Sequence, residues 1–164
     1  MKYLDRIASG AVIVAVVVFL VLVAKGDFSR PKFNQPQPQN LTGKTVSLPG
    51  LKLPAGQNSL VLVVSTTCHF CKDSLPFYKQ LTGKLDGRLN VVAVLPQPVP
   101  EARKFLKDAG ITTNEVVSAT PEQVGVRGTP TVLLVDSKGR VSHFWLGRLD
   151  QNGQQDLLKT VLPS

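Results

Sequence analysis

The chain has 164 residues, a formal net charge of +8 and a hydrophobic fraction of 43%. This length fits one globular domain, and the positive charge is spread along the chain instead of forming the concentrated patch typical of nucleic-acid-binding proteins. The densest basic cluster, Arg103, Lys104 and Lys107, falls on a predicted helix as a solvated face. We therefore predict no nucleic-acid partner.

A hydrophobic segment without charged residues occupies positions 7–24, after a short flank of residues 1–6. As a helix it would be about 27 Å long, which is just enough to cross the hydrocarbon core of a bilayer. The segment is longer than the core of a cleaved signal peptide, and Leu22-Val23-Ala24 is a poor cleavage site. We predict a single-pass transmembrane anchor. Basic residues flank both of its ends, so the positive-inside rule alone does not orient it.

Residues 25–40 are rich in proline and glutamine and carry few apolar side chains. Such a segment cannot bury enough apolar surface to fold, and its prolines favour extended backbone. We predict a tether that holds the following domain, residues 41–164, away from the membrane.

Residues 41–164 are predicted to form one α/β domain. Turn residues and a loose alternation over 41–53 indicate a small β-hairpin, continuous apolar runs indicate buried strands, and apolar residues at helical spacing indicate amphipathic helices. In chain order, the expected elements after the hairpin are strand 60–64, helix 68–81, strand 90–95, helix 98–109, a short strand at 116–117, strand 131–135, strand 141–146 and helix 157–162. This order predicts a three-layer sandwich with a mixed β-sheet.

The two cysteines of the sequence, Cys68 and Cys71, lie where a predicted buried strand gives way to a predicted helix. A thiol in the first turn of a helix faces unpaired backbone N–H groups and the positive end of the helix dipole, which stabilise a thiolate. We predict that Cys68 is a nucleophile and that Cys71, one turn deeper, resolves a mixed disulfide. His69 would add positive charge beside the thiolate, and Thr67 and Phe70 are further candidates for tuning it.

Other roles for the cysteine pair fit the sequence less well. A structural disulfide that closes so small a loop would add only about 2 kcal/mol of stability. A zinc site needs four ligands, and the adjacent positions of His69 and Cys68 make joint tetrahedral ligation awkward. Covalent haem attachment needs a histidine directly after the second cysteine, where the chain has Lys72. We predict neither a bound metal nor a cofactor.

A second motif, Gly128-Thr129-Pro130-Thr131, leads into the predicted strand 131–135, where a proline is tolerated at the strand's first position. Together with Cys68-His69-Phe70-Cys71 after a strand and Pro76 in the next helix, it resembles the thioredoxin superfamily. Within that superfamily the chain resembles the membrane-anchored, TlpA-like redoxin branch of thiol–disulfide interchange proteins. The resemblance implies that the bond before Pro130 is cis and that Pro130 packs against the cysteines. It also implies that the Thr129 backbone pairs with an incoming peptide and that the Thr129 hydroxyl tunes the thiolate.

The sequence departs from the family at two places. Thr67 stands where many members carry tryptophan, and strand 60–64 lacks the acidic residue that helps to deprotonate the second cysteine of thioredoxin. The proton acceptor for Cys71 is therefore unassigned.

The resemblance implies a thiol:disulfide oxidoreductase that acts on cysteine-containing proteins. A membrane or extracytoplasmic redox partner would recharge its cysteine pair. The domain would lie outside the cytoplasmic membrane of a bacterium, where disulfides persist. The direction of the reaction stays open.

Two functions of other classes also stay open. One is a redox-inert adaptor that keeps the peptide groove of the fold. The other is a copper-delivery protein with Cys68, Cys71 and His143 as ligands, since soft thiolates select Cu(I).

Overall fold

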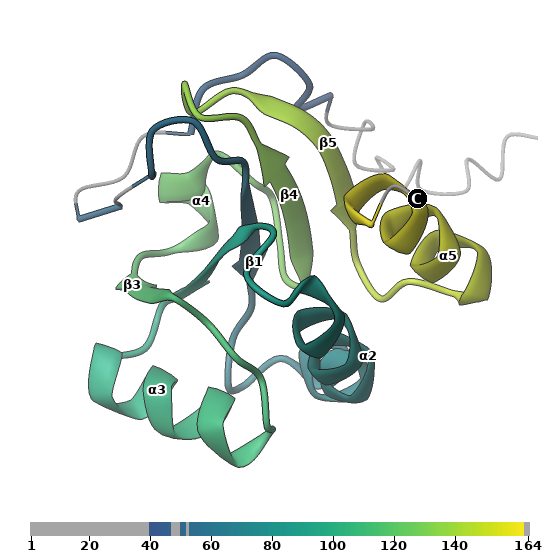
Figure 1. Ribbon diagram of the computed structural model, residues 1–164. Helices are drawn as coiled ribbons and strands as arrows, with labels where there is room; N and C mark the ends of the chain where they lie inside the picture. The colour runs from purple at the N-terminus through teal and green to yellow at the C-terminus, as the bar shows by residue number, and fades with distance from the viewer. Residues whose placement is uncertain (1–39, 47–49, 52, 163–164) are drawn as a thin grey trace, which may run out of the picture. The chain divides into compact units, whose positions relative to one another are not determined.

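The computed structural model describes residues 40–46, 50–51 and 53–162 (Figure 1). The predicted flank, the transmembrane anchor and the tether up to residue 39 lie outside these residues. Among the described residues, no helix is both long and apolar enough to cross a membrane.

Five strands form a single mixed sheet in the order β3-β2-β1-β4-β5. Their bounds are β1 Ser59–Val63, β2 Asn90–Leu95, β3 Glu115–Ser118, β4 Thr131–Val135 and β5 Val141–Leu146. The central strand β1 runs parallel to β2 and antiparallel to β4. At the two edges of the sheet, β3 is parallel to β2 and β5 is antiparallel to β4. These strands lie close to their predicted positions, and the mixed sheet confirms the α/β class.

Helices cover both faces of this sheet. Their bounds are α2 His69–Leu85, α3 Val99–Asp108, α4 Pro121–Val124 and α5 Gln151–Val161. Alternate residues of β1 face opposite sides, as a strand requires. Leu60 and Leu62 belong to one buried cluster with residues of α2, α3 and α5. Val61 and Val63 belong to a second cluster with Val124 of α4 and with the N-terminal segment of the domain. The two clusters explain why β1 is apolar throughout.

The β-hairpin predicted at 41–53 is not found in the described part of that segment. Instead, the segment pairs with the start of β5 and the turn before it. The backbone N–H of Gly43 donates to the carbonyl of Val141, and that of Val46 donates to the carbonyl of Gly139, each at 2.8 Å. The partner strand is therefore distant in sequence, which a local alternation pattern cannot reveal.

Two helices differ from the prediction because polar residues form their first turns. Helix α4 was not predicted, although Thr120 and Gln123 form a complete capping box at its start. Helix α5 begins at Gln151, six residues before its apolar stretch, because the Asp150 side chain accepts a hydrogen bond from the Gly153 N–H. Capping signals, rather than apolar periodicity, mark both starts.

Candidate active site

Cys68 lies at the N-cap of α2, directly before the first helical residue. Its backbone is extended (φ −81°, ψ 120°), and its sulfur accepts a hydrogen bond from the Cys71 backbone N–H at 3.2 Å. The cysteine sulfur therefore caps this helix. Cys68 is partly exposed, whereas Cys71 is fully buried, and both are free thiols. One thiol is thus accessible to a substrate and the other is reached only through the first.

The two thiols have opposite pKa shifts. Burial alone would raise the pKa of Cys68. Hydrogen bonds outweigh this effect and lower the pKa below its usual value of 9.0. They come from the side chains of Cys71 and Thr129 and from the backbones of Cys71 and Phe70. For Cys71, burial and the hydrogen bond that it gives to Cys68 raise the pKa to about 12. The shared proton thus stays on Cys71 and stabilises a thiolate at Cys68.

The segment before β4 lies next to the cysteine pair at the same end of the sheet. The peptide bond between Thr129 and Pro130 is cis, as the resemblance implied. Pro130 is buried, and its carbonyl accepts a hydrogen bond from the Gly147 N–H at 2.8 Å. The Cys68 thiol lies 3.4 Å from the Thr129 carbonyl, to which it can donate. Register explains this contact, since Thr131 at the start of β4 pairs with Val63 at the end of β1.

No carboxylate lies among the buried residues that the structure describes. The buried polar side chains are Ser59, Ser65, Ser74, Thr82 and Thr131, which all carry hydroxyl groups. The buried Tyr78 has a strongly raised pKa, mainly through burial, with smaller contributions from the charges of Cys71 and Cys68, and it is therefore a poor base. This agrees with the absence of an acidic residue from the sequence of β1.

The loop between β1 and α2 is held by a hydrogen-bond network that the sequence did not indicate. Gln97, in the connection from β2 to α3, accepts from the Thr66 backbone N–H at 3.4 Å and donates to the Ser65 hydroxyl at 3.2 Å. The Ser65 hydroxyl also lies 3.0 Å from the Thr67 hydroxyl and accepts from the Thr67 N–H at 3.3 Å. Thr66 Oγ1 donates to Glu101 at 3.4 Å. We call these five residues the loop network.

A second polar cluster lies on the exposed side of α2. Oδ2 of Asp73 is 3.1 Å from an Arg148 guanidinium nitrogen and 3.6 Å from Nε2 of His69. The His69 side chain is 83% exposed and faces Asp73. It is not among the groups that shift the pKa of Cys68, so its predicted role as a tuning cation stays a prediction. Thr67 and Phe70, the other predicted tuning residues, are both exposed, and Phe70 acts on Cys68 through its backbone.

The three ligands of the copper hypothesis are not brought together. His143 lies on β5, where it pairs with Leu134 and stacks on Trp145. The residue of β5 at the cysteine end of the sheet is instead Leu146, which pairs with Thr131. Within the part of the chain that the structure describes, no three His, Cys, Asp or Glu side chains are grouped to hold a metal.

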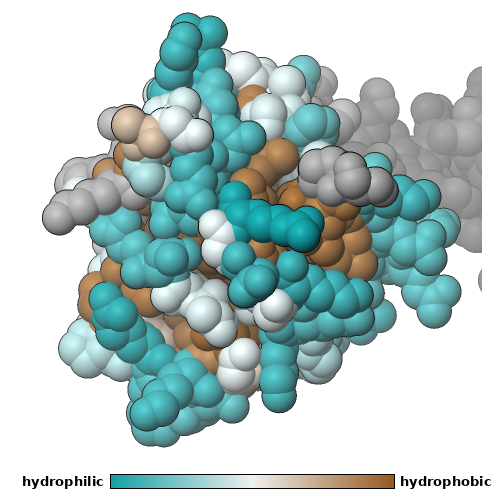
Figure 2. Space-filling view, viewed as in Figure 1, coloured by the Kyte–Doolittle hydropathy of each residue, from teal (hydrophilic) through white to brown (hydrophobic). Residues whose placement is uncertain are grey.

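The surface of the domain mixes apolar and polar residues. Figure 2 shows apolar areas between hydrophilic ones on the face that it presents. The large hydrophobic side chains described as exposed are Phe70, at 57%, and Leu146, at 42%. One follows Cys68 by two residues and the other pairs with Thr131, so both belong to the end of the sheet where the cysteines lie.

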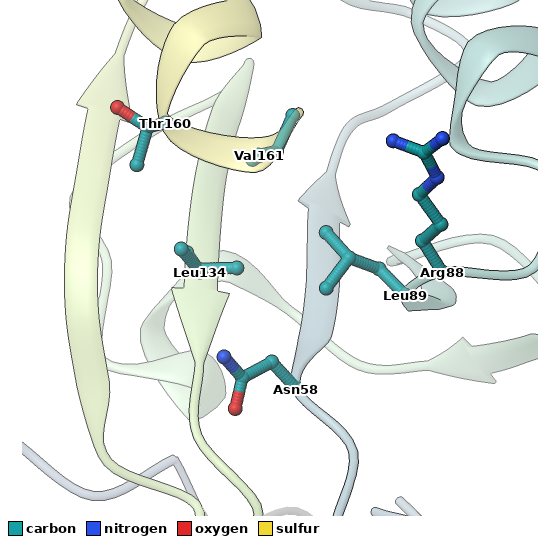
Figure 3. Close-up of a pocket in the computed structure, with 6 residues that line it drawn as sticks. All are labelled: Asn58, Arg88, Leu89, Leu134, Thr160 and Val161. Atoms are coloured by element: carbon teal, nitrogen blue, oxygen red, sulfur yellow. The ribbon is translucent and has the colours of Figure 1, made fainter. Parts of the chain in front are cut away.

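A cavity of about 320 Å³ lies at the other end of β1 (Figure 3). It is lined by Asn58, Arg88, Leu89, Leu134, Thr160 and Val161. The polar ends of Asn58, Arg88 and Thr160 point in different directions, so they do not converge on one ligand (Figure 3). We assign no chemistry to this cavity.

Comparisons with known proteins support the fold. No family model matches the sequence, and no curated protein matches it. Among solved structures, the chain is similar to a candidate thiol:disulfide interchange protein DsbE from Chlorobium tepidum, with 24% identity, a TM-score of 0.58, and coverage of 74% of this chain and 95% of that one. It is also similar to a thiol-disulfide isomerase from Corynebacterium glutamicum, with 24% identity, a TM-score of 0.53, and coverage of 77% and 96%.

A third similar structure is a thioredoxin-family thiol:disulfide interchange protein from Chlorobium tepidum TLS, with 22% identity, a TM-score of 0.53, and coverage of 76% and 98%. The match covers nearly the whole length of each of these three structures. In the present chain, the cysteine pair lies at the start of α2. The likeness establishes that this chain has a thioredoxin-like fold.

Proposed function

We propose that this protein is a thiol:disulfide oxidoreductase that acts on protein cysteines through Cys68 and Cys71. The observation that carries the proposal is the unequal environment of the two thiols. The partly exposed Cys68 sulfur receives the Cys71 N–H at 3.2 Å and has a lowered pKa, while the buried Cys71 keeps its proton. That the structural neighbours are described as thiol-disulfide interchange and isomerase proteins supports the same reaction class.

The chemistry divides between the two residues. The Cys68 thiolate attacks one sulfur of a substrate disulfide, the substrate S–S bond breaks, and its electron pair leaves with the second sulfur. Cys71 then loses its proton, which ends on a released substrate thiolate, and its sulfur attacks the Cys68 sulfur. The bond between Cys68 and the first substrate sulfur breaks, its electron pair leaves with that substrate sulfur, and the Cys68–Cys71 disulfide remains. Oxidation of a substrate dithiol is the same sequence in reverse. In either direction, Thr129 and Pro130 are the proposed contacts for the substrate backbone.

The test is a redox titration of the full-length chain in detergent against glutathione, with thiol trapping. A reversible two-electron couple that is lost in Cys68→Ser and in Cys71→Ser supports the proposal. A potential near about −270 mV would identify a reductant, and one near about −120 mV would identify an oxidant. Full-length protein that never forms or exchanges the disulfide would contradict the proposal and favour the adaptor.

We propose further that residues 7–24 anchor the protein in the cytoplasmic membrane and that the redox domain lies outside it. The uncharged apolar segment and the Pro/Gln-rich tether support this arrangement. In cells, a membrane-impermeant maleimide should label Cys68 without permeabilisation, and the protein should stay in the membrane fraction at alkaline pH. Labelling only after permeabilisation would contradict the orientation, and release into the soluble fraction would contradict the anchor.

A further inference from the structure

The loop network fixes the direction of every hydrogen bond within it. A backbone N–H can only donate, so the Thr66 N–H identifies the Gln97 atom that it contacts as the carbonyl oxygen. The other end of the Gln97 amide is therefore its NH₂ group, which donates to the Ser65 hydroxyl. The orientation of this amide is thus determined by the contacts themselves.

The same reasoning determines the two hydroxyl groups. A serine oxygen has two lone pairs and one proton. Ser65 Oγ accepts from the Gln97 NH₂ and from the Thr67 backbone N–H, so both lone pairs are in use. Its proton must then go to Thr67 Oγ1, which lies 3.0 Å away. The Thr67 hydroxyl oxygen therefore accepts a hydrogen bond from Ser65, and the proton of the Thr67 hydroxyl is not donated to Ser65.

The proton of Thr67 is available at the surface, next to the nucleophile. Thr67 is exposed and directly precedes Cys68, and the loop network accounts for its contacts within the described residues. The neighbouring Thr66 differs, because its hydroxyl proton is already donated to Glu101. Within the loop network, the Thr67 hydroxyl is therefore the one next to Cys68 in sequence whose proton is not donated to another member of the network.

In thiol–disulfide exchange, negative charge develops on the departing sulfur, and exchange is slower when the departing thiol has a high pKa. A fixed hydrogen-bond donor at the rim of the site stabilises that charge without transferring a proton. We propose that the Thr67 hydroxyl donates a hydrogen bond to the departing sulfur of the substrate, and that Gln97, through Ser65, is the positioning residue that turns the hydroxyl outward. The donor favours substrates with aliphatic cysteine-like leaving groups. This inference rests on the proposed oxidoreductase function.

The experiment compares two disulfides with the reduced full-length protein. One is glutathione disulfide, with an aliphatic leaving thiol of high pKa, and the other is an aromatic disulfide with a leaving thiol of low pKa. The ratio of the two second-order rate constants is the readout. Because the nucleophile is the same for both substrates, a change in the thiolate fraction of Cys68 cancels from this ratio.

Thr67→Val, which is nearly isosteric, should lower the glutathione-disulfide rate about tenfold relative to the aromatic disulfide, as expected for the loss of one hydrogen bond to a charged acceptor. Thr67→Ser should restore the ratio. Thr66→Val is the matched control and should leave the ratio unchanged. A Thr67→Val protein with the wild-type ratio, or with equal losses for both disulfides, would overturn the role of Thr67.

Gln97→Glu tests the positioning role. A carboxylate still accepts from the Thr66 N–H but cannot donate to Ser65, so Ser65 donates to it and Thr67 donates to Ser65 in turn. The outward donor is lost while the side chain keeps its size, and the ratio should fall as in Thr67→Val. An unchanged ratio would remove Gln97 from the proposal. If the wild-type protein exchanges with neither disulfide, the proposed function itself fails, and that result is distinct from a failure of Thr67.

Discussion

The indole N–H of Trp145 donates a hydrogen bond of 2.8 Å to Oδ2 of Asp156. Trp145 is buried on β5 and Asp156 lies on α5, so the bond joins the last strand to the last helix. Gly147 follows β5 in the connection to α5, and its backbone N–H donates a hydrogen bond to the Pro130 carbonyl. The packing of α5 therefore supports the segment that faces the cysteine pair.

Asp156→Ala should destabilise the protein by about 1–2 kcal/mol, because it leaves the indole N–H of a buried tryptophan without its acceptor. Arg148→Ala is a useful contrast, since it breaks the exposed pair with Asp73 and should cost less than about 1 kcal/mol. Urea unfolding measures both, and a Trp145→Phe/Asp156→Ala cycle isolates the coupling. A coupling energy near zero would show that the bond contributes nothing to stability.

The reduction potential of the cysteine pair should depend on pH with a slope of about −30 mV per unit over a wide range. Between the lowered pKa of Cys68 and the pKa of about 12 of Cys71, reduction of the disulfide takes up one proton. One proton changes the equilibrium tenfold per pH unit, which is about 30 mV for a two-electron couple. Titrations at several pH values check this, after correction for the thiol buffer. A slope of about −60 mV per unit above pH 9 would mean that both thiols are protonated there and would contradict the lowered pKa of Cys68.

Alkylation of the reduced protein should be selective for Cys68. Its labelling rate should follow the thiolate fraction, rising with pH through a pKa below 9.0 and levelling off above it. Cys71 should stay unlabelled at neutral pH, because it is buried and keeps its proton until about pH 12. Iodoacetamide labelling followed by peptide mass spectrometry measures both rates. Cys71→Ala should raise the pKa of Cys68, since it removes the side-chain hydrogen bond that lowers that pKa most.

Thr129→Val should raise the pKa of Cys68 by removing a hydroxyl hydrogen bond to the thiolate. Fewer thiolates would then be present at neutral pH, so the alkylation rate should fall there and recover at alkaline pH. Thr129→Ser keeps the hydroxyl and should behave like the wild type. The absorbance of the thiolate near 240 nm, followed against pH, reports the pKa, and an unchanged midpoint in Thr129→Val would exclude this role of the hydroxyl.

Much of the fold could be predicted because its signals are local. The apolar run before Cys68 predicted β1 because a central strand is buried on both faces, and the residues after Pro130 predicted β4 for the same reason. Helix starts were less well predicted. The first turns of α4 and α5 are polar and are marked by caps, so apolar periodicity missed them, although the capping box of Thr120 and Gln123 could have been found.

The sequence by itself determined where the candidate chemistry lies, because a pair of cysteines between a strand and a helix and a Thr-Pro before a later strand are patterns of a few adjacent residues. Only the tertiary structure decided which groups surround Cys68. The contact with the Thr129 carbonyl spans 61 positions, the Gln97 contact with Ser65 spans 32, and the Arg148 contact with Asp73 spans 75. Such contacts depend on strand order and register, since the antiparallel pairing of β1 with β4 brings Thr131 to Val63. No local pattern records that pairing, and it places the Thr129 segment beside Cys68.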